Sequence, residues 1–204
     1  MKKRIHAFIL AMLAFQPLTW GQTSLRDAFA NAPDEIFPLL TRNNRLDCLD
    51  FAENKVKMEV NNIADGKTRI DSLTQDYMRI LMTKRSIVEM HLMRSANQEA
   101  PCICLIRSYL GPAEDSHVSI YDTQWKLLGE VERPQAEAFF DENLNREARG
   151  ILSDLSLMRA TFTLNGDSLI WTMPTTELNK EQKKAAEGHI HSIIRPIIIK
   201  DKGK

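Results

Sequence analysis

Two aspartates near the N-terminus have the spacing of a carboxylate pair. Asp47 and Asp50 lie three residues apart in a segment with helical periodicity, and Arg45 precedes them. Side chains three apart share one helix face, so the two carboxylates could carry out acid–base chemistry together. The same spacing suits an ion network that fixes the helix to its neighbours. Because no aromatic-rich sugar platform accompanies the pair, the ion network is favoured, and a hydrolase built around these carboxylates is the alternative.

Two histidines near the C-terminus have the spacing of a pair of metal ligands. His189 and His191 are two residues apart, so an extended chain would present both imidazoles on one face. Zinc sites use this arrangement but need further ligands, and Glu187 is the nearest candidate. A partly exposed polar pair without metal is the alternative interpretation.

The segment Asp115-Ser116-His117 contains the three residue types of a hydrolase triad. Adjacent side chains diverge on a strand, whereas a triad needs side chains that converge from separate segments, so we expect a turn with local hydrogen bonds. The motifs G-x-S-x-G, G-x-x-x-x-G-K, G-x-G-x-x-G and H-E-x-x-H do not occur in the chain. The sequence therefore indicates no cofactor and favours a protein that is not an enzyme.

The three cysteines, Cys48, Cys102 and Cys104, cannot all pair within one chain. Cys102 and Cys104 alternate with apolar residues, which predicts that both sulfurs point to one face of a strand. A disulfide between Cys48 and either of them stays possible, but core packing is the favoured interpretation.

An aromatic pair provides a further candidate binding site. Tyr121 and Trp125 are four residues apart, so on a continuous strand they would share a face beside Asp122. Arg45 could form a bidentate contact with Asp122 or Asp47 and so pin a helix to the end of a strand. These residues are expected to form a structural clasp, with an aromatic ligand-binding groove as the alternative.

The elements that must position these residues are short helices followed by strands. Helical spacing and capping residues predict helices at 24–32, 34–40, 43–51, 133–140 and 179–186. Alternating or β-rich runs predict strands at 56–60, 77–83, 86–93, 101–110, 117–128, 155–164, 168–173 and 193–200. Asn165-Gly166 is the strongest hairpin signal.

This series predicts an α+β fold, a mostly antiparallel sheet with short N-terminal helices and one or two later helices packed on it. The chain has no long linker, fixed repeat or low-complexity tract, so we expect residues 22–204 to form one domain, possibly two subdomains that share a sheet.

The N-terminus has the layout of a secretory signal peptide. Lys2, Lys3 and Arg4 precede an apolar run at 7–15, and cleavage is expected after Gly21, with a cut after Ala14 as the alternative. The apolar run is shorter than the ~20 residues of a membrane-spanning helix, so no stable membrane insertion is expected after cleavage. A periplasmic or secreted location follows from this N-terminal layout.

The 204 residues carry 27 basic and 27 acidic side chains, which argues against a nucleic-acid partner.

Three segments resemble the signature of an uncharacterised Bacteroidetes family, domain of unknown function 3256. These are residues 33–51, which end in TRNNRLDCLDF at 41–51, then LTQDY at 73–77 and DSHVSIYDTQW at 115–125, and the resemblance spans residues 24 to about 196. It implies an exported α+β protein of the Gram-negative envelope and carries no known activity or site. The tail at 189–204 departs from the pattern because it lacks an aromatic residue in the closing strand.

Asp71-Ser72-Leu73 and Asp167-Ser168-Leu169 also resemble the acceptor for O-glycosylation of exported Bacteroidetes proteins, which makes Ser72 and Ser168 candidate glycan sites. Together these features predict a binding or protein-interaction module of the envelope, whose partner is an unknown envelope protein or a small ligand.

Overall fold

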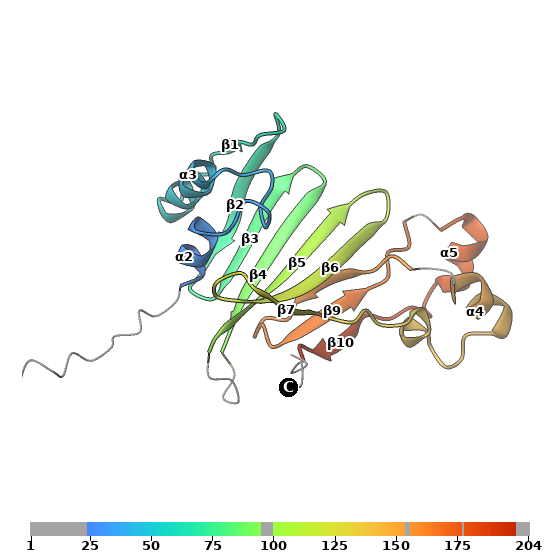
Figure 1. The fold of residues 1–204 in the computed structure, drawn as a ribbon. Coiled ribbons are helices and arrows are strands. Elements are labelled where there is room, and N and C mark those ends of the chain that lie inside the picture. Colours follow the sequence, from blue (N-terminus) through green and yellow to red (C-terminus); the bar gives the residue numbers. More distant parts are fainter. Residues whose placement is uncertain (1–23, 95–99, 154–155, 177, 199–204) are drawn as a thin grey trace, which may run out of the picture.

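The computed structural model describes residues 24–94, 100–153, 156–176 and 178–198. It contains a large antiparallel sheet with an N-terminal layer on one side and a smaller C-terminal sheet on the other (Figure 1). The predicted signal peptide at 1–21 and its cleavage point after Gly21 lie outside the described residues. Among the helices of the described ranges, none is long and apolar enough to cross a membrane.

The large sheet has seven strands whose spatial order follows the chain. They are β1 (Val60–Asn61), β2 (Lys67–Leu73), β3 (Tyr77–Thr83), β4 (Ser86–Met93), β5 (Cys102–Leu110), β6 (Glu114–Asp122) and β7 (Leu127–Glu130). Each strand pairs antiparallel with the next, and the β5–β6 ladder runs unbroken from Cys102↔Asp122 to Leu110↔Glu114. This meander needs only short connections, as antiparallel neighbours allow.

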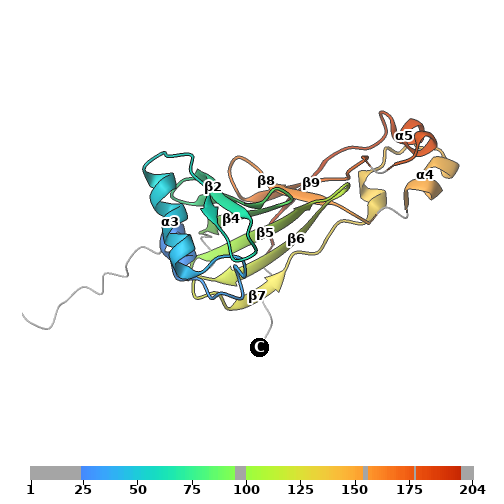
Figure 2. The same ribbon diagram turned by 90° about the horizontal axis from the view of Figure 1, so that it is seen from above.

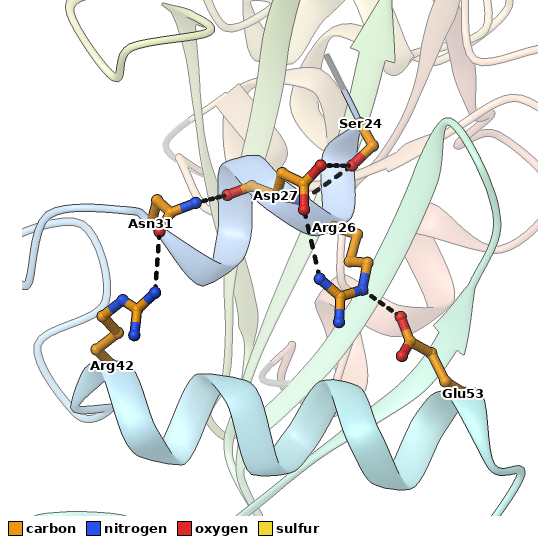
Figure 3. Close-up of polar contacts among 6 residues, drawn as sticks. All are labelled: Ser24, Arg26, Asp27, Asn31, Arg42 and Glu53. Atoms are coloured by element: carbon orange, nitrogen blue, oxygen red, sulfur yellow. Dashed lines mark hydrogen bonds and ion pairs between the residues drawn. The ribbon is translucent and has the colours of Figure 1, made fainter. Parts of the chain in front are cut away.

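The N-terminal layer consists of α2 (Leu25–Ala30), a run of turns, and α3 (Arg42–Glu53). Ser24 caps α2, and Thr41 caps α3 in a capping box with Asn44. Figure 3 shows polar contacts along the two helices: Arg26 reaches Glu53, and Arg42 reaches Asn31. These contacts are exposed, so the buried apolar side chains of the layer, rather than these polar pairs, hold it on the sheet.

The C-terminal part contains two strands of a hairpin, a third strand and three short helices. In chain order these are η1 (Ala136–Phe139), α4 (Arg146–Ser153), β8 (Arg159–Phe162), β9 (Ser168–Thr172), α5 (Lys180–Ala186) and β10 (Ile193–Pro196). The three strands pair in the order β10-β9-β8. Figure 2 shows β8 and β9 alongside β5 and β6, with α4 and α5 at the far end. The Ser116 amide donates to the Met158 carbonyl at 2.8 Å, which joins β6 to the approach of β8.

The large sheet separates two hydrophobic cores. Met90 and Leu105 point into the core beneath the N-terminal layer, whereas Ile106 and Val118 point into the core beneath the small sheet, where Trp171 is fully buried. Successive side chains of a strand face opposite sides, so the central strands must bury both sets.

The cysteines are distributed between the two cores. Cys48 lies in the N-terminal core, Cys102 and Cys104 lie in the C-terminal core, and all three are free thiols. The disulfide that the sequence left possible is therefore not formed. Burial raises the pKa of the Cys48 thiol to about 12 and also raises the pKa values of Cys102 and Cys104, so none is poised as a nucleophile.

The α+β class and the large antiparallel sheet are confirmed, and so are the Asn165-Gly166 turn and the capped helix that begins after Asn179. The helices are few, and those of the described ranges lie both before and after the large sheet rather than mostly at the N-terminus. The last strand ends at Pro196, whose missing N–H cannot extend a ladder.

Several predicted boundaries were wrong. Residues 34–40 form turns instead of a helix, since Pro38 lacks a backbone donor and Arg45 binds the carbonyl of Leu40. The helix expected at 133–140 is reduced to η1, and the strand expected from 56 is reduced to β1.

Two elements were missed. In β2 a bulge between Ile70 and Ser72 breaks the alternation that identifies a strand. In α4 the central Gly150 lowers the helix propensity of a segment that nevertheless buries Ala148 and Leu152, one turn apart.

Candidate functional site

The largest of the described cavities is a cleft where the end of β4 meets the tip of the β8–β9 hairpin. Its volume is about 630 Å³, which falls within the roughly 300–1,000 Å³ of typical ligand pockets. We call it the hairpin cleft, and its described lining consists of Asp76, His91, Leu92, Met93, Arg94, Asn165, Gly166, Asp167 and Ile197. Segments far apart in the sequence therefore meet around one open space.

The hairpin tip fixes His91 in the wall of this cleft. The imidazole is half-buried and packs against Phe162, with 5.5 Å between ring centroids. A Cβ atom at Gly166 would lie 1.9 Å from His91 Nε2, and Gly166 has a φ of +71°. Only glycine satisfies both the backbone conformation and the close approach. The Asn165-Gly166 turn, which the sequence predicted as a hairpin, therefore also positions a titratable side chain.

The charges around the cleft are mixed. Burial lowers the pKa of His91, while Asp76 and Asp167 act in the opposite direction. Arg94 Nη1 donates to Asp76 Oδ1 at 2.6 Å. The two carboxylates and the guanidinium can exchange hydrogen bonds with a polar molecule in the cleft.

A partly buried polar pair lies beside His91 on β3 and β4, where Tyr77 is the cross-strand neighbour of His91. The Tyr77 hydroxyl donates to Glu89 Oε1 at 2.6 Å, and Glu89 is only 6% exposed. The Tyr77 ring packs edge-on against Phe162 at 6.2 Å. Burial is the main cause that raises the pKa of Tyr77, followed by the hydrogen bond to Glu89. This pair anchors the strands beneath the hairpin.

Arg45 lies away from the cleft, inside the N-terminal layer. Its guanidinium is 2% exposed and donates to the carbonyls of Leu40 and Ala32 at 2.7 Å each and to Asp34 Oδ1 at 3.0 Å. The expected contacts with Asp47 or Asp122 are not formed, because the 33–40 turns bring Asp34 and the two carbonyls to the guanidinium first. Arg45 therefore ties these turns to α3.

Tyr121 and Trp125 also belong to the N-terminal core. Both are 8% exposed, and their rings lie 5.5 Å apart. Trp125 lies in the turn after β6 with a φ of +67°, not on a continuous strand, and its Nε1 donates to the Ala28 carbonyl at 2.9 Å. Asp122 Oδ1 accepts the turn amides of Gln124 and Lys126. This arrangement joins β6 to α2.

The two aspartates of the carboxylate pair lie on the outer surface of α3. Asp47 and Asp50 are both exposed, and Asp50 Oδ1 accepts from Asn54 Nδ2 at 3.1 Å. Neither lines the hairpin cleft, so the structure does not bring them to the polar groups around it.

The two C-terminal histidines meet an acidic residue that the sequence did not single out. His189 Nδ1 lies 3.8 Å and His191 Nε2 lies 3.9 Å from Asp141 Oδ2. The amide of Asn143 is the main cause that lowers the pKa of Asp141, with further contributions from both imidazoles. Among the residues that the structure describes, no group of three or more His, Cys, Asp or Glu side chains is suited to hold a metal ion.

His191 and Glu187 additionally line a cavity of about 390 Å³ beside α5. The histidines and Asp141 form a partly exposed polar cluster near this cavity.

The three adjacent residues that imitate a triad do not converge on one another. Asp115 accepts from Arg133 and from the Met158 amide, while the buried Ser116 hydroxyl is hydrogen-bonded to Ser108 at 2.7 Å. His117 is exposed beside Glu130 at 3.3 Å. Each side chain thus has a separate partner. The turn expected here is wrong, because all three residues belong to β6, where they pair with β5.

The two candidate glycan sites lie on different sheets. Ser72 is a half-buried residue of β2 and pairs with Arg79 of the neighbouring strand, and Ser168 is a half-buried residue at the start of β9.

The sequence analysis did not single out His91, Tyr77 and Glu89 as site residues, because they lie on strands without any recognisable motif. They could have been recognised as polar side chains within strands whose other residues are predicted to be buried on both faces.

A family model described as "Protein of unknown function (DUF3256)" matches residues 19–200. The chain belongs to this family. The DUF3256 chain is also similar to a solved domain of an uncharacterized protein from Porphyromonas gingivalis W83, with 20% sequence identity and a TM-score of 0.70. That likeness covers 84% of this chain and 92% of the other, and it concerns the fold. No curated protein matches the chain.

Replacing Arg45 by methionine should destabilise the DUF3256 chain by about 3 kcal/mol, because two buried carbonyls lose their donor. Asp34→Ala is the matched control, since that carboxylate is 76% exposed and should contribute at most about 1 kcal/mol. Urea unfolding of both variants measures the difference. Equal losses would show that the ion pair, not the carbonyl contacts, carries the effect.

Stability should fall as the pH drops below about 6.5, partly because of His91. Its pKa is lowered in the folded state, so the unfolded chain binds the proton more readily, and stability decreases as the pH falls from the unfolded pKa through the folded one. Urea midpoints of wild type and His91→Phe at pH 7.5 and 5.5 test this. The variant should lose less stability on acidification than wild type. An unchanged pH dependence in His91→Phe contradicts the assignment.

Proposed function

We propose that this DUF3256 protein is an exported, non-catalytic binding module that takes a small polar ligand in the hairpin cleft. The observation that carries the proposal is the cleft itself, which has the volume of a ligand pocket and mixes charged with apolar side chains. The Asn165-Gly166 tip holds His91 in place before any ligand binds, and such preorganisation favours affinity.

The lining indicates what kind of molecule would fit. Asp76, Asp167 and the Arg94 guanidinium can exchange hydrogen bonds with hydroxyl, amine or carboxylate groups. Met93 and Ile197, which pack against the C-terminal core, provide an apolar wall. A ligand of the size of an amino acid, a monosaccharide or a small dicarboxylate matches this combination.

The rival function, a hydrolase built on Asp47 and Asp50, gains no support from their positions. Both carboxylates are exposed on α3 and line none of the described cavities, whereas a hydrolase needs its carboxylates in a site that holds the substrate. Binding is therefore the function that the geometry supports better.

The proposal includes export to the periplasm or beyond. It is supported by the basic and apolar layout of residues 1–21 and by the expected cut after Gly21. Glycosylation at Ser72 and Ser168 belongs to the same proposal, since the modification is one of exported proteins.

Intact-mass measurement of the protein from its native envelope fraction tests export. We expect a chain that begins at Gln22, with additional mass on the peptides that contain Ser72 or Ser168. A cytosolic protein that retains residues 1–21 would contradict export. A processed chain with only its peptide mass would reject glycosylation and leave export intact.

Amide chemical shifts of the ¹⁵N-labelled mature chain test ligand binding in the hairpin cleft. Amino acids, monosaccharides and dicarboxylates are titrated in turn, and we expect at least one to shift the amides around His91 and Asp167. Asp167→Ala should weaken that binding, because Asp167 lies on the cleft lining, where its carboxylate accepts from the Thr163 hydroxyl at 3.2 Å.

The matched control for this titration is Asp47→Ala, which removes an exposed aspartate of α3 and should leave binding unchanged. If all three probe classes leave the cleft amides unmoved at millimolar concentration, the cleft is not a site for a small polar ligand. Shifts that gather around Asp47 and Asp50 would favour the rival site.

A further inference from the structure

A smaller groove lies on the side of the large sheet that carries the N-terminal layer. It forms where the 36–39 turns meet the ends of β3, β4 and β5, and its volume is about 120 Å³. Ile36, Pro38, Met82 and Val88 contribute to its mostly apolar lining. This volume is well below the roughly 300–1,000 Å³ that encloses a whole small molecule. The groove therefore suits one apolar side chain better than a long acyl chain.

Large apolar side chains are exposed beside the groove. Tyr109 lines it and is 58% exposed. Ile63 is 64% exposed, and its amide donates to the carbonyl of Leu39, another lining residue, at 3.1 Å. Exposed tyrosine next to an apolar depression is typical of protein-binding surfaces.

Arg107 gives the groove a positive charge. Of the described residues that line it, Arg107 alone is charged, and its Nη2 donates to the Ile36 carbonyl at 3.2 Å. Across the described ranges, no carboxylate lies within the 4.0 Å of an ion pair with Arg107. The exposed Lys84-Arg85 turn is adjacent, because the Leu110 amide donates to the Arg85 carbonyl at 2.7 Å. A half-buried guanidinium without an acidic partner is complementary to a carboxylate.

We propose that this groove binds the C-terminal residue of a partner protein, with the apolar side chain in the pocket and the terminal carboxylate on Arg107. The carboxylate completes the hydrogen-bonding capacity of the guanidinium, and Tyr109 covers the preceding part of the peptide. The groove contacts the N-terminal layer, whereas the hairpin cleft contacts the β8–β9 hairpin, so the two sites are separate. A negative binding result at one site therefore does not contradict the proposal for the other site.

Fluorescence anisotropy with labelled hexapeptides tests the proposal on the mature chain. The peptides end in valine, leucine or phenylalanine, and each is used as a free acid and as a C-terminal amide. We expect the best acid to bind at least about tenfold more tightly than its amide, as befits a charge-assisted contact. Arg107→Met should remove this difference, and Arg195→Met, an exposed arginine of β10, should retain it.

Tyr109→Ala separates binding from folding, since this exposed side chain can be removed without opening a core. It should weaken both acid and amide, while Asp167→Ala in the hairpin cleft should change neither. Equal affinities of acid and amide, or an unchanged preference in Arg107→Met, would overturn the proposal. Binding of dodecanoate with no binding of any peptide acid would also overturn it and assign the groove to an acyl chain.

Discussion

Burial of the central strands on both faces is the constraint on which this structure depends. Residues 102–106 of β5 are all buried, and they alternate between the N-terminal and the C-terminal core. An antiparallel meander covers neither of its faces by itself, so two separate layers must be supplied from the two ends of the chain. The N-terminal helices and turns cover one face, and the small sheet covers the other.

Each layer has polar contacts, within the layer or to a strand of the large sheet, that would be costly to leave unpaired. Arg45 satisfies two buried carbonyls of the N-terminal turns, and Trp125 joins the end of β6 to α2 through the Ala28 carbonyl. On the other face, Ser116 bonds both Ser108 and the amide of Ala160. Such satisfied polar groups fix where a layer lies as well as adding stability, because a shifted layer would leave them without partners.

The openings of the molecule lie where these layers end. The hairpin cleft forms at the border of the small sheet, and the groove with Arg107 forms at the border of the N-terminal layer. Both are built from segments distant in sequence on a rigid sheet, which is a usual setting for binding residues. The predicted site residues Arg45, Tyr121 and Trp125 are instead buried in the N-terminal part, where Arg45 and the Trp125 Nε1 donate to backbone carbonyls.

Local pattern by itself determined the α+β class, the strands from β3 to β6, the Asn165-Gly166 hairpin and the capped helix after Asn179, because each rests on neighbours within a few residues. It failed where local order is broken, at the β2 bulge and at Gly150 in α4. Only the tertiary structure decided that Asp34 pairs with Arg45, that Asp141 meets His189 and His191, and that Gly166 packs on His91. These contacts join residues separated by many positions, and their pairing follows from how the two layers dock on the sheet, which no local periodicity encodes.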